Sequence, residues 1–226
     1  MIRRRVIVLG ACAALAFGWL LAPILPQDAD DVSSVLKAHD GTVLHIGSVD
    51  DGRIRLPVDL SAVDPAFVEA LIAIEDQRFF THPGVDFLAI GRAVRSNIRA
   101  GEIVSGASTI TQQLGRQYRP RPRTLRTKII EALEAVRLDL RMGKSEQLAR
   151  YLTRISYGSN IEGIEAATRI WLGKTPRYLT VDEIALLLAL PQSPEARRPD
   201  RNPIAAKAGR DLILDRMHLA GLIDAS

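Results

Sequence analysis

The sequence is poor in the residues and motifs that mark several common functional sites. Its only cysteine is Cys12, so the chain can form neither an internal disulfide nor a cysteine-based zinc site. The 4 histidines are scattered, without metal-ligand spacing. The sequence has no GxGxxG or Walker-type loop and no internal repeat. These absences argue against a disulfide scaffold, a zinc module, a nucleotide-binding fold of those two kinds and a solenoid.

The composition is that of a folded domain with a mild excess of positive charge. Of the 226 residues, 47% are hydrophobic and 25% are charged, which allows one good core and argues against extended disorder. The formal net charge is +4 and the sequence pI is about 9.5. This balance suits an anionic partner, but charge alone does not distinguish nucleic acid from phosphate or membrane.

The N-terminal segment carries the pattern of a membrane anchor. No charge interrupts residues 6–25, and a helix of that length spans about one hydrocarbon core. Three arginines precede the run and three aspartates follow it, namely Arg3, Arg4 and Arg5, then Asp28, Asp30 and Asp31. We therefore expect a cytoplasmic tail at 1–5 and a transmembrane anchor at 6–25, with the remainder outside the cytoplasm. The alternative is a cleaved signal peptide, whose apolar region is normally shorter.

The rest of the chain divides into a neck and a helical domain. Residues 26–58 contain two β-prone runs around Asp40-Gly41, a hairpin signal, and "RIRLP" adds a further short strand. Residues 59–226 have helical patterns almost throughout, so we expect one mainly α domain. Its expected helices begin after Asp64, cover residues 124–142, begin near Ser145, follow the Thr180–Glu183 capping box, and run from Asn202-Pro203 to about Gly221.

Two of these helices have an apolar row of residues at helical spacing. The row of the first is Val68, Leu71, Ile72 and Phe79, and the row of the second is Leu125, Ile129, Leu133, Val136 and Leu140. The helix after Thr180 is apolar on all sides, which predicts a place in the core.

Glu75, in the stretch "AIEDQRFFTHPG", is the first candidate catalytic residue. It lies on the apolar row of its own helix rather than on the wet face. A buried carboxylate needs a partner or has a raised pKa, and a glutamate of that kind suits a general base working near neutral pH. The alternative is a helix-terminal glutamate hydrogen-bonded to Arg78, after which Pro and Gly end the helix.

Two further stretches have the character of an anion site. In "SGASTITQQLGR", residues 105–116, a Gly-Ser-Thr segment precedes a helix, where N–H groups and hydroxyls bind anions or simply cap the helix. Gln112 and Gln113 add amides that suit sugar hydroxyls. Residues 116–131 are strongly basic, which a solvated loop, RNA binding or pyrophosphate binding would each explain. With one tyrosine in the tract, base stacking is disfavoured, and Lys128 and Glu131 share a helix face, which favours pyrophosphate.

Taken together, five ordered stretches resemble a known family. They are "EDQRFFTHPGVD", "SGASTITQQ", "KIIEALEAVRLD", "KSEQLARYL" and "EGIEAATRIWLGK". Their order and spacing over about residues 60–200 are similar to those of the peptidoglycan glycosyltransferase domain of monofunctional transglycosylases and class A penicillin-binding proteins. The resemblance implies a mainly α, lysozyme-like glycosyltransferase domain behind an N-terminal transmembrane helix and a small β-containing neck.

The family's activity would be polymerisation of lipid II into β-1,4-linked glycan strands, with inversion and release of undecaprenyl pyrophosphate. The resemblance assigns Glu75 as the catalytic base and Glu131 as the second essential glutamate. It places Arg116, Arg123 and Lys128 at phosphate-binding positions, with Arg116 in place of the usual lysine. The other residues that match the substrate cleft are Asp76, Phe79, His82, Gly84, Ser108, Thr109, Gln112 and Gln113.

The same resemblance implies the surroundings of the enzyme. Its partners would be lipid II, the growing lipid-linked strand and the cytoplasmic membrane, with a transpeptidase or other cell-wall enzyme as a candidate protein partner and no nucleic acid. The catalytic domain would lie on the outer, periplasmic face of the bacterial inner membrane, behind a single span whose N-terminus is inside. Phosphate-binding cations make a metal or other cofactor unnecessary, although stimulation by a divalent ion stays open.

Several positions depart from the family pattern. Thr127 stands where arginine is common, Thr153 where asparagine is usual, Ala107 in a frequent Gly-Gly-Ser and Asp139 in place of a glutamate. No transpeptidase motif set is present, since "SVLK" at 34–37 has no KTG partner. The chain is then a monofunctional enzyme or a piece of a longer one. The rival functions are a glycan-cleaving lysozyme-like enzyme and an inactive membrane-tethered scaffold.

Overall fold

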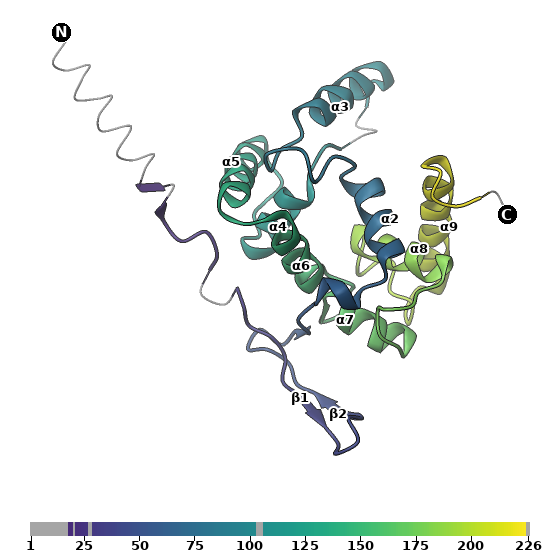
Figure 1. Cartoon of the computed structure of the whole chain (residues 1–226). Helices are drawn as coiled ribbons and strands as arrows, with labels where there is room; N and C mark the ends of the chain where they lie inside the picture. Colours follow the sequence, from purple (N-terminus) through teal and green to yellow (C-terminus); the bar gives the residue numbers. More distant parts are fainter. Residues whose placement is uncertain (1–17, 20, 27–28, 103–105, 225–226) are drawn as a thin grey trace, which may run out of the picture.

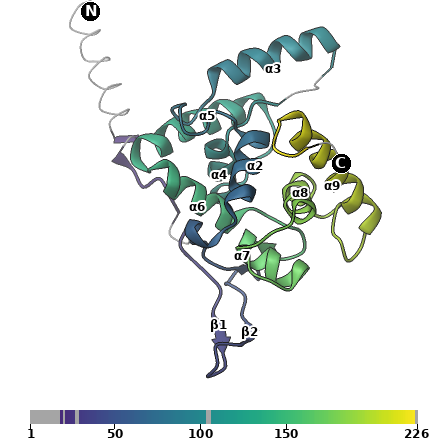
Figure 2. The ribbon, with the colours of Figure 1, turned by 45° about the vertical axis from the view of Figure 1, so that its right-hand side comes forward.

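The computed structural model describes residues 18–19, 21–26, 29–102 and 106–224, and it is mainly helical, as predicted (Figures 1 and 2). Most of the expected anchor at 6–25 lies outside these residues. Within the described part of the chain, no helix has the length and hydropathy needed to cross a membrane. The tail, anchor, neck and domain boundaries therefore stay predictions.

The expected hairpin is present and extends from one end of the molecule. β1 (Val35–Lys37) and β2 (Val43–Ile46) pair antiparallel around Gly41, whose φ of 86° suits glycine. In both views the hairpin lies at the end opposite α3. The "RIRLP" strand is also present. It is β3 (Ile54–Arg55), which pairs parallel with β4 (Ile161–Glu162) and so joins the neck to the helical part.

Helix α2 (Pro65–Glu75) lies at the centre of the helical part. Asp64 caps its first turn and Pro65 begins it, as the sequence predicts. Phe67 and Leu71 are fully buried in the core. The expected helix is too long, because α2 ends at Glu75 and a tight turn follows, in which the N–H of Phe79 donates to the carbonyl of Asp76. Phe79 is nevertheless fully buried, because that turn folds back onto the core.

Two groups of helices lie on either side of α2 (Figure 1). On one side lie α4 (Ile110–Tyr118), α5 (Leu125–Arg141) and α6 (Lys144–Arg154), with α4 in contact with both of the others. On the other side, α8 (Val181–Ala189) packs against α9 (Pro203–Leu219), and both contact α2. Four short helical segments complete the described fold, namely η1 (Leu60–Ala62), α7 (Ile164–Ala167), η2 (Thr168–Leu172) and η3 (Leu190–Gln192). The apolar helix α8 is buried, as predicted.

One helix and one helix face differ from expectation. Helix α3 (Phe87–Ala100) was not among the expected helices, and it lies at the end of the molecule away from the hairpin (Figure 1). The predicted row on α5 does not point into the core, since Leu125, Ile129, Leu133 and Leu140 are 55–80% exposed. The buried residues of α5 are instead Thr127, Glu131, Ala135, Arg137 and Leu138, of which Leu138 is the one large apolar side chain. Phe87, Leu88, Val94 and Ile98 of α3 are also more than half exposed.

Candidate active site

Glu75 lies at the C-terminal end of α2, half-buried between two cavities. One cavity, about 180 Å³ in volume, is lined by Glu75, Gln113, Arg116 and Arg123, and we call it the cationic cavity. The other, about 200 Å³, includes Glu75 and Ser108, and we call it the hydroxyl cavity. Because α2 ends here, its last side chain reaches both spaces.

The Glu75 carboxylate is held by two neutral amides. Gln113 donates from Nε2 to Oε2 at 3.2 Å, and Gln192 donates from Nε2 to Oε1 at 3.4 Å. The alternative pairing with Arg78 is wrong, because the Arg78 guanidinium binds Asp86 instead and lowers the pKa of that carboxyl to about 2. A carboxylate at a cavity wall, with hydrogen-bond donors on both oxygens, is geometrically suited to accept a proton from a bound hydroxyl.

Glu131, on the core side of α5, is held by cations. Arg116 makes a two-pronged ion pair with it, at 2.8 Å from Nε to Oε1 and 2.9 Å from Nη2 to Oε2. Lys128, one turn earlier on α5, lies 3.4 Å from Oε2. Burial acts to raise the pKa of Glu131, but the hydrogen bonds and charges of Arg116 and Lys128 outweigh it, so the net pKa is lowered. Glu131 is thus a fixed anion, and the ion pairs it makes hold Arg116 and Lys128 in place.

The predicted cations are brought close to Glu75. Arg116 and Arg123 line the same cavity as its carboxylate, one from α4 and one from the loop before α5. Lys128 donates to Ser108 Oγ at 2.5 Å, and Ser108 lines the hydroxyl cavity. Two of the expected cations therefore line one of the spaces at Glu75, and the third contacts a residue that lines the other.

Other predicted residues form a buried frame around these cavities, and two of them, Asp76 and Thr109, also line the hydroxyl cavity. Asp76 accepts from the Ile110 N–H at 2.9 Å and pairs with His82 Nε2 at 2.9 and 3.0 Å, both side chains being buried. Burial raises the pKa of Asp76, although the Ile110 and His82 contacts oppose the rise. Phe79 is fully buried, and neither Phe79 nor His82 is among the residues that line the two cavities.

Gly84 and the residues around Thr109 fix the start of α4. Gly84 has φ of 78°, and a Cβ there would lie 2.2 Å from the carbonyl oxygen of Ala135. Its own carbonyl accepts from Thr109 Oγ1 at 2.6 Å. Thr109 and Gln112 complete a capping box at the N-terminus of α4. In the described structure, these side chains hold the helix rather than reaching into the cationic cavity.

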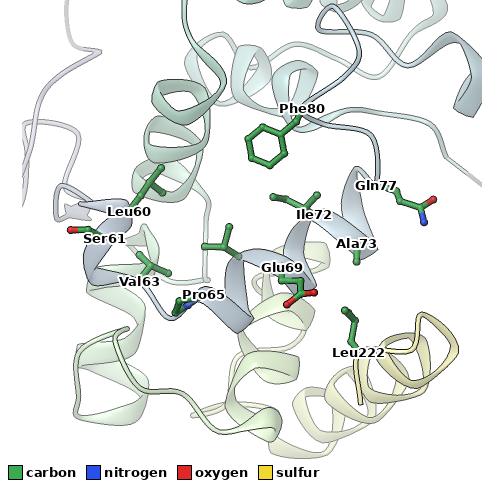
Figure 3. A pocket seen from close by; sticks show the side chains of 11 residues that line it. Leu60, Ser61, Val63, Pro65, Glu69, Ile72, Ala73, Gln77, Phe80 and Leu222 are labelled. Carbon is green, nitrogen blue, oxygen red and sulfur yellow. The ribbon is translucent and has the colours of Figure 1, made fainter. Parts of the chain in front are cut away.

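A larger cavity, about 610 Å³, lies on another face of α2 (Figure 3). Its walls are mostly apolar and include Ile72 of α2, Phe80 and Leu222 near the C-terminal end. Glu69 and Gln77 are its polar side chains besides Ser61. None of the predicted catalytic or phosphate-binding residues lines it, so size does not identify the catalytic cavity.

The match to known proteins decides the family. A family model described as Transglycosylase matches residues 41–218. The chain belongs to the transglycosylase family. It is 39% identical over 198 residues to penicillin-binding protein 1C of Escherichia coli, covering 88% of this chain and 26% of that protein. Penicillin-binding protein 2D of Bacillus subtilis is 37% identical over 229 residues, and penicillin-binding protein 1A of Aquifex aeolicus is 41% identical over 170 residues. These matches cover 97% and 75% of this chain, and 33% and 23% of the relatives.

The family prediction is therefore confirmed. The stretches "RIRLPVDL" and "LPQSPEARRPDRNP" indicated penicillin-binding protein 1C in particular, and that protein is among the similar relatives. The chain spans about a quarter to a third of the length of the relatives named here.

The departures from the family pattern have local partners in the structure. Thr127 Oγ1 lies 3.0 Å from Thr124 Oγ1, at the capped start of α5. Thr153 Oγ1 donates to the Ala149 carbonyl and accepts from the Val58 N–H at 3.2 Å. Both threonines therefore make local side-chain hydrogen bonds in the helices that carry them.

Two residues beside Glu75 were not expected from the sequence to belong to the site. Gln192 follows the buried helix α8 and Pro191, and it was quoted only for its resemblance to a relative. Tyr151 lies in the helix expected to begin near Ser145, and its hydroxyl donates to Gln113 Oε1 at 3.1 Å. For Gln192 the sequence offers only a weak signal, namely a polar residue shortly after an apolar helix.

Proposed function

We propose that this chain polymerises lipid II into β-1,4-linked glycan strands, with inversion at the anomeric carbon. In this reaction, the 4-hydroxyl oxygen of the acceptor N-acetylglucosamine attacks C1 of N-acetylmuramic acid in the donor strand. The hydroxyl proton passes to the Glu75 carboxylate as the C1–O bond to undecaprenyl pyrophosphate breaks. The observation that carries the proposal is that Glu75, Arg116 and Arg123 line one cavity.

The cations contribute where the negative charge develops. The departing pyrophosphate gains charge in the transition state, and fixed guanidinium and ammonium groups stabilise it there more than in the ground state. Arg116 is held in place by Glu131, so less reorganisation is needed when the charge appears. Lys128 and Arg123 complete the set. This scheme needs no metal, and adding a divalent ion to the assay tests for stimulation.

The buried frame residues are proposed to position the catalytic ones. Asp76 and His82 link the turn after Glu75 to the first turn of α4, through the Ile110 N–H. Gly84 and Thr109 fix the same junction from the other side. Gln113 contacts Glu75 itself. Substrate contact is then assigned to Ser108 and the cations, and support to the others.

We also propose that the domain works at the outer face of the bacterial inner membrane. Helices α3 and α5 each expose several large apolar side chains, among them Leu133, and exposed apolar surface of this kind supports membrane or protein contact. Basic residues of the 116–131 tract would add attraction to anionic lipid. Sedimentation with anionic vesicles tests it. Leu133→Asp is expected to reduce binding, and unchanged binding would contradict the membrane assignment for this surface.

Incubation with two substrates distinguishes the proposed reaction from its rival. With lipid II, the purified chain is expected to form polymer and release undecaprenyl pyrophosphate. With finished glycan, it is expected to release no fragments, because a lytic enzyme has no use for cations that stabilise a pyrophosphate. Cleavage without polymerisation would establish the rival, and inactivity on both would favour the scaffold.

A further inference from the structure

The C-terminal part of the chain reaches the Glu75 carboxylate through a side chain outside the family motifs. Gln192, at the end of η3, donates from Nε2 to Glu75 Oε1 at 3.4 Å. Gln113 occupies the other oxygen. The carboxylate is therefore held from two sides, by α4 and by the segment that follows α8.

A glutamine amide can present its oxygen or its nitrogen, and a second contact decides which. Arg197 Nη1 donates to Gln192 Oε1 at 3.2 Å. Because a guanidinium has donors and no acceptor, it fixes the oxygen of Gln192 on its own side and leaves the NH₂ for Glu75. Tyr151 does the same for Gln113. Burial raises the pKa of the Tyr151 hydroxyl well above its usual value. The hydroxyl therefore stays protonated and donates to Gln113.

Arg197 is itself held firmly. Its Nη1 also donates to the Ala189 carbonyl, at the end of α8, at 2.8 Å. Its side chain lies against Gly209 of α9, where an added Cβ would come within 3.0 Å of Cδ and Nε. Because residue 209 has no side chain, there is room for the Arg197 side chain at this position.

Helix α9 makes a second contact near Glu75. Arg216 Nη2 donates to the Ile74 carbonyl at 2.8 Å, at the last turn of α2. A cation there satisfies a free carbonyl and suits the negative end of the helix dipole. The two arginines thus fix both the backbone that carries Glu75 and the amide that meets its carboxylate.

We propose that Gln192 is a positioning residue for the Glu75 carboxylate, and that Arg197, seated on Gly209, sets the orientation of the Gln192 amide. The proposal rests on the proposed function, in which Glu75 accepts the proton. It assigns to the C-terminal segment a part in catalysis, in addition to packing. Gln192 itself is exposed, so its loss should cost little stability.

The pH dependence of the rate distinguishes a Gln192 that positions the Glu75 carboxylate from one that only packs against it. An N–H donor to a carboxylate stabilises the charged form, so Gln192→Leu is expected to move the acid limb of kcat/KM up by about half a unit or more. We expect kcat to fall several-fold with KM and Tm unchanged. Gln192→Glu should move the limb further in the same direction, because a second carboxylate disfavours ionisation of the first.

A double-mutant cycle tests the role of Arg197. Arg197→Leu is expected to produce a smaller shift in the same direction, and the double variant with Gln192→Leu should match Gln192→Leu alone. Arg210→Leu is the matched control. It removes another arginine, on α9, whose partners Asp182 and Asp211 lie at the surface, and the profile should not move. The other charged or titratable groups facing Glu75 are unchanged in every variant, namely Arg116, Arg123, Tyr151, Tyr157, Asp76, Asp86 and Arg92.

Two outcomes overturn this proposal. One is an acid limb that stays in place in Gln192→Leu, and the other is additive effects in the double variant. If the wild-type chain forms no polymer, the proposed function fails instead. The titration of Glu75 by ¹³C NMR, assigned with Glu75→Gln, then still tests the contact, because it needs no turnover. An unchanged titration curve in Gln192→Leu would reject the positioning role on its own.

Discussion

The two candidate catalytic glutamates are held in opposite ways. Glu131 is buried and clamped by two cations, which lower its pKa. Glu75 is half-buried, and its described hydrogen-bond partners, Gln113 and Gln192, are neutral amides. A carboxylate fixed by cations resists protonation, whereas one held by amides can take up a proton without breaking an ion pair. The difference supports the proposal that Glu75 accepts the proton and that Glu131 holds the cations in place.

The strongest test of this comparison is Glu75→Gln. The substitution keeps the shape and the amide contacts but removes the proton acceptor. We expect polymerisation of lipid II to fall by about 10²–10⁴-fold, the usual contribution of a general base, with circular dichroism and Tm unchanged. Glu69→Gln, at an exposed position on the same helix, is the control and should keep full activity. Wild-type rates in Glu75→Gln would remove this residue from the mechanism.

Glu131→Gln should affect both activity and stability. Arg116 would lose its two-pronged ion pair and its fixed position, so turnover should fall by about 10²-fold if the ordered cation supplies transition-state stabilisation. The free energy of unfolding should fall by about 1–3 kcal/mol, because a half-buried guanidinium is left without its anion. Chemical denaturation and a lipid II assay measure the two effects. A loss of stability with full activity would reduce Glu131 to a structural residue.

Lys128→Ala should separate the two properties. The Lys128 side chain is about half exposed, so its pairing with Glu131 contributes little to stability, and Tm should change by no more than about 2 °C. Turnover should fall by about tenfold or more, and Lys128→Arg should restore part of it, because the positive charge returns. Similar small changes in rate and Tm would indicate an ordinary surface ion pair.

The smallest expected effect is on the pH dependence of stability. Since the pKa of Glu131 is lowered in the folded state from 4.5, its ion pair contributes stability above about pH 4.5, and that contribution disappears as the pH falls through the folded-state value. The difference in unfolding free energy between wild type and Glu131→Gln should therefore shrink as the pH falls below 4.5. A constant difference down to pH 3 would show that the ion pair is not its source.

The sequence predicted where helices begin better than it predicted which of their faces are buried. Caps at Asp64, Thr180 and Asn202 are local signals, and the helices begin where these predict. The α5 row has correct helical spacing, yet Leu133 and its neighbours face outward, because a period identifies an apolar face without saying what covers it. Phe79 was placed on a helix that ends four residues earlier.

The candidate site shows the same division. Glu75 and the basic tract stand out in the sequence alone. The order and spacing of the five motifs were enough to identify the family, and the resemblance then singled out the individual cations. Only the tertiary structure decided that Gln192, 117 residues away from Glu75, meets its carboxylate, and that Glu131 holds Arg116. Local patterns report backbone preferences and faces, which short-range physics determines. Which side chains meet across the fold depends on how the helices pack.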